Sequence, residues 1–589
     1  MASIVKRQPK GCPEPVYYYH ETYRVRVDDP EPGKKASKVK SKDVYLGTAS
    51  QVLEKIRNGQ RPQTVRVKEF GLVMAALREA EEIGLVEVID RLVPKRRQGY
   101  TVGQYLLVAA LNKIAAPTSR NGIREWLYKT VLPERLGIDP DAFTSQNFWD
   151  HFELILSERE LKENKERLER GEMTEDELFD DAVIGQIEEG IWRNVLERHR
   201  APLDSVFYYD TTNFYSFLEA TTPSYLARTG YNKHGRHHLR QVGLGLAITR
   251  DGSLPVLHLL HHGRKADARL FPGAMSELVE RYLQLTGGTQ KLTVVFDKGN
   301  NSEENVQKAC ALGITAVGSL VPSHHRDLMG VRLVRYNDEV DGRPVYVTRK
   351  EVFGMDVKIA VVYNAGTYRR QRARLREKVE QLRTAVQERF EAVKHRPKDE
   401  IETEVQAVLR ESEYGRYLTV AISGRRFKRL ICKIHLANYH AKLRTFGKLV
   451  VFTTNTELSA QEMVRLYTGK YEIEDQFRQM NDPEAIAFRP RYHWTDTKIK
   501  VYALICVLAL LLLQLMNYRA RQAGLHMSNA VLRQELADIR EVAILYSLAQ
   551  VEKRLTEMST IQQQLFDLFD LGRYTHRRAA TTLSLRGAG

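Results

Sequence analysis

At 589 residues the chain is too long for a single hydrophobic core, so we expect two to four domains. Apolar residues make up 43% of the chain and charged residues 28%, a balance that is typical of globular proteins. The formal net charge of +16 and the pI near 9.4 indicate a polyanionic partner, for which DNA, RNA and an anionic membrane all qualify.

Cysteine spacing and hydropathy exclude several protein classes. The four cysteines are far apart and form no CxxC pair, which argues against a disulfide framework or a structural zinc site and suits a reducing cytoplasm. The N-terminus lacks an apolar stretch suited to a signal peptide. The most apolar run, residues 501–513, is shorter than the roughly 20 residues that span a bilayer, so we expect a buried helix and no membrane partner.

The first 200 residues divide into two expected regions. Residues 1–60 read as a loosely organised basic arm, and the lysine-rich run at 33–42 is either a solvated tail or a DNA contact. Residues 61–200 have apolar residues at helical spacing, which predicts a helical domain. That domain would serve either DNA-end binding or dimerisation, and the sequence does not separate the two.

From residue 201 to 330 the pattern changes to alternating strands and helices. We expect strands at 205–210, 241–249, 254–260, 292–297 and 314–318, with helices at 268–285 and 302–312. Gly252-Ser253 reads as the hairpin turn between the second and third strands. This order is that of an RNase H-like fold, in which the first strand and the end of the fourth carry acidic residues. Asp210 and Asp297 close the corresponding apolar runs.

The α/β pattern is then interrupted, which predicts a core split in two. Residues 331–444 read as an insertion, β-rich at first and followed by an antiparallel helical hairpin, and its five arginines between 369 and 376 form either a solvated face or a phosphate grip. Residues 445–520 return to the core, with Ser459 as the N-cap of a long helix that carries Glu474. Residues 521–589 read as a helical basic C-terminal region.

Three acidic residues carry the functional argument. Phosphodiester hydrolysis or transfer needs charge neutralisation at the attacking and leaving oxygens, and two Mg²⁺ ions held by carboxylates provide it. Asp210, Asp297 and Glu474 stand where adjacent strands and one packed helix would hold such carboxylates. On the helix, Tyr467, Lys470 and Glu474 share one face, whereas Glu472 lies about 160° away from Glu474. Helical phase therefore favours Glu474.

The segment around Glu474 resembles the Tyr-x2-Arg-x3-Glu-x6-Lys signature of DDE transposases encoded by bacterial insertion sequences, in the cut-and-paste class with a β-rich insertion. Tyr467 and Glu474 match this signature, while Lys470 replaces its arginine and Asn481 its final lysine. Residues 210–212 and 297–302 are similar to the first and second aspartate motifs of the family. So are residues 230–241, although His234 and His238 stand where aspartates are expected.

The resemblance, which covers roughly residues 70 to 520, implies a reaction in two stages. DNA is cleaved at terminal inverted repeats to free a 3′-OH, which then attacks target DNA in the same site. It implies that Asp210, Asp297 and Glu474 are the catalytic and metal-binding residues for two Mg²⁺ ions, with Mn²⁺ as a substitute. The expected DNA-binding residues are Lys233, Arg236, Arg240, Lys298, Tyr467 and Lys470. Of these, Lys233, Arg236, Arg240 and Lys470 are expected to hold phosphates near the metal ions. A homodimer is expected because two DNA ends must be paired.

Two other functions remain open. One is a metal-dependent nuclease that cuts DNA without strand transfer, and the other is a non-catalytic DNA-binding protein on the same scaffold. The intact acidic trio disfavours the second, because a binding protein gains nothing from three clustered carboxylates beside phosphate. The paired histidines of the chain lack the spacing of a zinc site, so we expect them to be loop or core residues.

Overall fold

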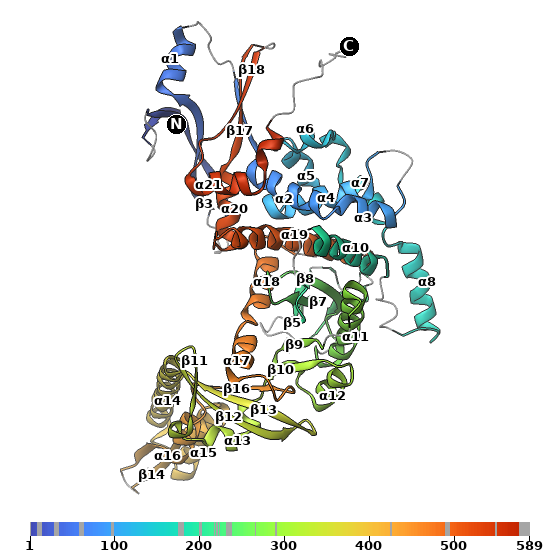
Figure 1. The fold of residues 1–589 in the computed structure, drawn as a ribbon. Coiled ribbons are helices and arrows are strands. Elements are labelled where there is room, and N and C mark those ends of the chain that lie inside the picture. Colours follow the sequence, from blue (N-terminus) through green and yellow to red (C-terminus); the bar gives the residue numbers. More distant parts are fainter. Residues whose placement is uncertain are drawn as a thin grey trace.

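The computed structural model describes residues 2–8, 14–28, 35–57, 64–95, 99–174, 182–198, 203–216, 218–219, 222, 224–230, 238–264, 267–288, 291–424, 427–488, 495–547 and 550–575. Within these residues the chain is a mixed α/β protein with one large mixed sheet, as the sequence predicted. Figure 1 shows a helical layer and the N-terminal strands on one side of this sheet, and a separate unit of helices and strands at the opposite end of the molecule.

The N-terminal residues form a small sheet where the sequence predicted a loosely organised arm. Strands β1 (Ala2–Arg7), β2 (Val16–Asp28) and β3 (Lys35–Thr48) pair antiparallel, and α1 (Ala49–Arg57) follows. Val44 of β3 is buried in a cluster with Val542, Ile544 and Tyr546. These apolar partners come from the other end of the chain, so the local sequence pattern could not show that this segment has a core to pack on.

Helices dominate the next region, as expected, and their buried faces join one continuous core with the central sheet. The exception is strand β4 (Thr64–Glu69), which precedes them. The helices are α2 (Gly71–Glu82), α3 (Leu85–Leu92), α4 (Val102–Ala115), α5 (Arg120–Leu127), α6 (Leu132–Leu136), α7 (Ser145–Phe152), α8 (Glu158–Glu169) and α10 (Ala182–Arg198).

The C-terminal region is not purely helical, which corrects the sequence prediction. Between α20 (Asn529–Asp538) and α21 (Thr560–Leu568) lies a hairpin of β17 (Arg540–Ser547) and β18 (Gln550–Leu555). β17 also pairs antiparallel with β4, so the two ends of the chain share a three-stranded sheet. In β17, buried Val542, Ile544 and Tyr546 alternate with half-buried Ala543 and Leu545, a period-2 burial pattern that is typical of a strand.

The central strands follow the predicted layout. β5 (Val206–Ser216), β7 (Arg240–Thr249), β8 (Pro255–His262), β9 (Thr293–Phe296) and β10 (Thr315–Ser319) lie in the order β8-β7-β5-β9-β10. The first three are antiparallel, and β9 is parallel to both β5 and β10. Gly252 and Ser253 form the β7–β8 turn with positive φ angles. Helices α11 (Asp267–Thr286) and α12 (Glu303–Ala311) connect β8, β9 and β10.

β5 is longer than predicted, which corrects the expectation that Asp210 closes a strand. Residues 211–216 continue to pair with β7, from Thr211 opposite Gly245 to Ser216 opposite Arg240. The pairing with β9, however, ends at Tyr209 opposite Phe296. Asp210 therefore lies at the end of the parallel contact while remaining inside the strand.

The expected boundary at residue 331 is not where a separate unit begins. The sheet continues beyond β10 through β16 (Lys448–Thr453), β13 (Met355–Tyr363), β12 (Arg343–Val352) and β11 (Asp338–Val340). A second hydrophobic core starts only after β13. It is built from α14 (Ala365–Val393), α15 (Lys398–Glu411), β14 (Leu418–Ser423), β15 (Arg429–Ile434) and α16 (Leu436–Leu443). The arginines between 369 and 376 are exposed on α14.

The most apolar helix is α19 (Asp496–Gln522), which lies between the N-terminal helices and the central sheet (Figure 1). Of the helices that the structure describes, it alone is long and apolar enough to cross a membrane, with a mean hydropathy of 2.4 over its most apolar 18 residues. That whole stretch is buried inside the protein. α19 is therefore packed as the core helix that the sequence predicted for residues 501–513.

Candidate active site

Two of the predicted acidic residues meet because of strand register. β5 and β9 run parallel, and Tyr209 pairs with Phe296. The next residue on each strand is an aspartate, Asp210 on β5 and Asp297 directly after β9, so both stand at the same level of the sheet. Asp297 also caps the short 3₁₀ helix of residues 298–300, where its carboxylate accepts a hydrogen bond from the backbone N–H of Lys298 at 2.8 Å. Its backbone position is thereby fixed.

The predicted long helix is two consecutive helices, α17 (Ala460–Thr468) and α18 (Tyr471–Asn481). Ser459 caps α17 in a capping box with Glu462, as expected of an N-cap, but Glu474 lies on α18. The break falls at Gly469, where a Cβ would lie 2.1 Å from the hydroxyl oxygen of Tyr208 on β5. This close approach brings the start of α18 onto the strand that carries Asp210.

Glu472 and Glu474 separate as helical phase predicted. Glu472 accepts a hydrogen bond from the hydroxyl of Ser253 at 2.9 Å, in the turn between β7 and β8. The Glu474 carboxylate instead lies 3.1 Å from the ammonium of Lys470. Glu474 thus shares the Lys470 ammonium with the two aspartates, whereas Glu472 is directed to the β7–β8 turn.

Lys470 lies at the centre of the acidic group. Its Nζ is 3.9 Å from the Asp210 carboxylate and 3.5 Å from that of Asp297, in addition to the contact with Glu474. The Lys470 side chain is only 8% exposed, whereas that of Asp210 is 21% exposed, that of Asp297 35% and that of Glu474 60%. Burial lowers the pKa of Lys470, but the surrounding carboxylates outweigh it and raise the pKa above its ordinary value. Lys470 therefore carries a positive charge at neutral pH, among three carboxylates.

Ser319 belongs to this site although the sequence argument did not single it out. The β9–β10 register pairs Val295 with Val317, which places Ser319 level with Asp297. The Tyr467 hydroxyl donates a hydrogen bond to Ser319 Oγ at 2.7 Å, and the Asn301 side-chain amide donates to the Ser319 carbonyl. Burial, the largest effect, raises the pKa of Tyr467, and the charge of Asp297 adds to it. The sequence does contain a signal for Ser319, because it directly follows the predicted strand 314–318, which ends at the same sheet edge as Asp297.

The other predicted DNA-binding residues have different positions. Lys298 is exposed beside Asp297. Arg240 does not reach the carboxylates, because it pairs with Ser216, six residues along β5 from Asp210, a separation of about 20 Å at 3.3 Å per residue. Its guanidinium donates to the Thr222 carbonyl at 2.6 Å. Lys233 and Arg236 lie outside the described residues, as does His234.

The three carboxylates suit a hard cation, but the Lys470 ammonium occupies the space between them. Three carboxylates offer the oxygen ligands that Mg²⁺ prefers, and all three are reachable from solvent. Among the residues that the structure describes, no group of three or more His, Cys, Asp and Glu side chains is positioned to hold a metal ion as it stands. The chemistry of the residues therefore fits Mg²⁺, and the arrangement shown has the Lys470 ammonium between them.

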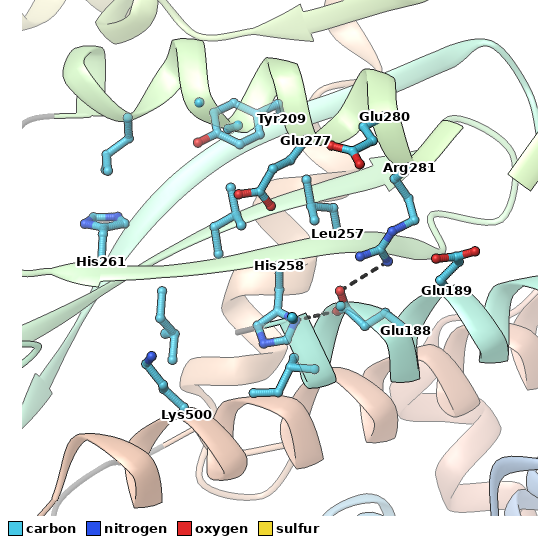
Figure 2. A pocket seen from close by; sticks show the side chains of 18 of the residues that line it. Glu188, Glu189, Tyr209, Leu257, His258, His261, Glu277, Glu280, Arg281 and Lys500 are labelled. Carbon is cyan, nitrogen blue, oxygen red and sulfur yellow. Dashed lines mark hydrogen bonds and ion pairs between the residues drawn. The ribbon is translucent and has the colours of Figure 1, made fainter. Parts of the chain in front are cut away.

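A cavity of about 520 Å³ lies near the sheet edge, between β8, α10 and α11 (Figure 2). Tyr209 lines it, and since neighbouring residues on a strand point to opposite faces, Asp210 points away from it. Figure 2 shows Glu188 of α10 joined to His258 of β8 and to the Arg281 guanidinium of α11, the latter at 3.3 Å. This buried cluster ties the helical layer to the sheet, on the other face from the carboxylates.

The sequence profile of the family described as Transposase DDE domain matches residues 216–512, just over half of the chain. The chain belongs to the DDE transposase family. Asp297 and Glu474 lie inside the matched segment, and Asp210 stands six residues before it. Membership implies an enzyme that cleaves and transfers DNA, and the family generally uses divalent metal ions.

No curated protein sequence matches this DDE transposase. Among solved structures, the cryo-EM structure of a piggyBac transposase synaptic complex with hairpin DNA is similar to it at 9% sequence identity and a TM-score of 0.39. The similarity covers 81% of this chain and 82% of that one.

Proposed function

We propose that this protein is the transposase of a bacterial insertion sequence. It cleaves double-stranded DNA at the terminal inverted repeats of its element and joins the freed 3′-OH ends to target DNA. The observation that carries the proposal is the convergence of Asp210, Asp297 and Glu474, from three separate segments, within 4 Å of the one Lys470 ammonium. A chain with a net charge of +16 is suited to hold a polyanion against such an acidic centre.

Asp210, Asp297 and Glu474 would hold two Mg²⁺ ions, for which Mn²⁺ would substitute. Bound there, the metal neutralises charge on the attacking and leaving oxygens of a phosphodiester. In the first stage water attacks the phosphorus and the P–O3′ bond breaks, which leaves a 3′-OH and a 5′-phosphate. In the second stage that 3′-OH attacks a target phosphorus and displaces its 3′-oxygen.

The surrounding residues position the DNA backbone. Lys298 is exposed next to Asp297 and places a cation at the rim of the site. The Tyr467 hydroxyl donates to Ser319 and holds the end of β10 against α17. We propose that Lys298, Tyr467 and Lys470 contact phosphates near the scissile bond and that Arg240 contacts DNA further away. Lys233 and Arg236, which lie outside the described residues, are also proposed to contact DNA.

We also propose how the regions divide the work. Residues 201–330 and 445–520 make an RNase H-like core, strands β11 to β13 extend its sheet, and the unit with its own hydrophobic core, from α14 to α16, is inserted into it. The N-terminal region, with the C-terminal hairpin that pairs with it, would recognise the DNA ends or mediate dimerisation. A homodimer would pair the two ends of the element on chromosomal DNA in the cytoplasm.

The test combines purified protein, Mg²⁺, DNA that carries the inverted repeats flanking its own gene, and a supercoiled target plasmid. The proposal predicts new 3′-OH ends followed by joined products, both absent with Asp297→Asn protein. Cleavage without joining would support a nuclease on the same fold instead. Neither cleavage nor joining, with protein that binds these ends, would contradict both functions.

A further inference from the structure

The acidic site contains a cation of the protein itself, the ammonium of the buried Lys470 side chain. The Lys470 side chain is 92% buried, since only 8% of it is exposed, while the three carboxylates around it are open to solvent to different degrees. A metal ion arriving from solvent therefore meets the carboxylate oxygens first, with the ammonium behind them.

The position of the ammonium depends on a side chain rather than on the backbone. The backbone before Lys470 is fixed by the contact of Gly469 with Tyr208. The Lys470 side chain, in contrast, has four flexible methylene groups between its backbone and its charge. The ammonium can leave the carboxylates by rotation of these bonds while α17, α18 and the sheet stay in place.

Electrostatics makes the lysine and a metal ion alternatives. Three carboxylates within 4 Å of one point repel one another, and a single ammonium cancels part of that charge. Mg²⁺ binds oxygens at about 2.0–2.1 Å, so it would occupy the space between these carboxylates. An ammonium that stayed between these carboxylates would fill that space and repel the incoming Mg²⁺.

We infer that Lys470 is a built-in counter-ion that holds the acidic trio together before a divalent cation binds, and that its ammonium must withdraw when the cation enters. This inference rests on the proposed metal-dependent function of the site. Lys470 stands where the family signature has an arginine. Its compact ammonium has one charged atom to withdraw, whereas a guanidinium would hold two carboxylates at once.

The first experiment measures Mn²⁺ binding by calorimetry in the full-length protein without DNA. Lys470→Met keeps the length of the side chain but removes the competitor, so the Mn²⁺ dissociation constant should fall roughly tenfold. The matched control is Lys448→Met. Lys448 is half-buried, and its Nζ donates hydrogen bonds to the carbonyls of Met329 and Val331, away from the acidic trio. It should leave Mn²⁺ affinity unchanged.

The second experiment uses the wild-type chain and does not depend on the folding of a variant. Amine-reactive labelling, read by mass spectrometry, should modify Lys470 several-fold faster with Mn²⁺ than without it, and Lys448 at an unchanged rate. In Asp297→Asn protein the Mn²⁺ effect on Lys470 should disappear.

The outcomes distinguish failure of this inference from failure of the proposed metal-dependent function. Tighter Mn²⁺ binding by Lys470→Met, or metal-induced exposure of Lys470, supports the inference. If wild type binds Mn²⁺ through Asp297 while Lys470→Met binds it equally or less tightly and labelling of Lys470 does not rise, the inference is wrong and the function stands. If wild type binds no Mn²⁺ with or without DNA, both fail.

Discussion

Gly469 packs directly on the hydroxyl of Tyr208, so closely that a Cβ at this position would lie 2.1 Å from the hydroxyl oxygen. Its φ of −62° is accessible to any residue, so the requirement for glycine here is one of space. The contact sets how near the start of α18 comes to β5. It therefore determines whether Lys470 and Glu474 reach Asp210.

Gly469→Ala should reduce DNA cleavage at least tenfold, because displacement of a catalytic group by about 1 Å can cost about 10²-fold in rate. The second substitution Tyr208→Phe should restore part of the loss, since it removes the hydroxyl but leaves the ring carbon 2.9 Å from the new methyl group. Cleavage rates of the single and double variants measure this. Full activity of Gly469→Ala would show that the contact does not position α18.

Glu79 should make the protein less stable as pH rises. Complete burial raises the pKa of Glu79 to about 7, against the opposing charges of Arg519 and Arg78. Because its folded pKa lies above its unfolded value, its contribution is fully present below about pH 4.5 and is lost as pH rises through 7, on the order of 3 kcal/mol at most. Glu79→Gln should melt at a higher temperature than wild type at pH 8 but not at pH 5. Arg519 keeps Glu82 as a partner in this variant.

Asp496 should have the opposite effect to Glu79 and make the protein less stable as pH falls. Its buried carboxylate accepts hydrogen bonds from the Ser224 hydroxyl at 2.5 Å, from the N–H groups of Tyr225 and Leu226, and from Lys165 at 2.9 Å. Burial alone would raise its pKa, but Lys165 and these donors lower it below the ordinary value. Its contribution is present above about pH 4 and is lost as pH falls through the folded pKa.

Asp496→Asn should therefore destabilise the protein by about 3 kcal/mol near neutral pH, because it leaves Lys165 without its buried partner. The difference from wild type should shrink in acid, which calorimetric melting between pH 3 and pH 7 would show. A pH-independent difference would mean that the charge of Asp496 is not what stabilises this end of α19.

The site could be predicted where its geometry follows from local periodicity. The apolar runs that end at Tyr209 and Phe296 are visible in the sequence, and an aspartate follows each. Helical phase separated Glu474 from Glu472 because residues two positions apart on a helix point about 160° away from each other. The distance from Lys470 to both aspartates depends instead on how α18 packs on β5, which the sequence alone does not determine.

The fold was harder to predict where partners are distant in sequence. β3 and β4 at one end of the chain depend on β17 at the other end, through Val44, Val542 and Ile544. The basic composition around β3 hid this apolar contact. Arg240 was misplaced relative to the carboxylates for a related reason, because the length of β5 is decided by its pairing with β7.

Comparison of Glu474 with Glu472 is the sharpest test of the active-site assignment. They have the same side chain and lie two residues apart on α18. Glu474 contacts the Lys470 ammonium, whereas Glu472 accepts a hydrogen bond from Ser253. The measurement is the initial rate of DNA-end cleavage with Mg²⁺ for Glu474→Gln and Glu472→Gln. We expect Glu474→Gln to lose at least roughly a hundredfold and Glu472→Gln to stay within about threefold of wild type. Cleavage by Glu474→Gln at the wild-type rate would contradict the assignment of the active site.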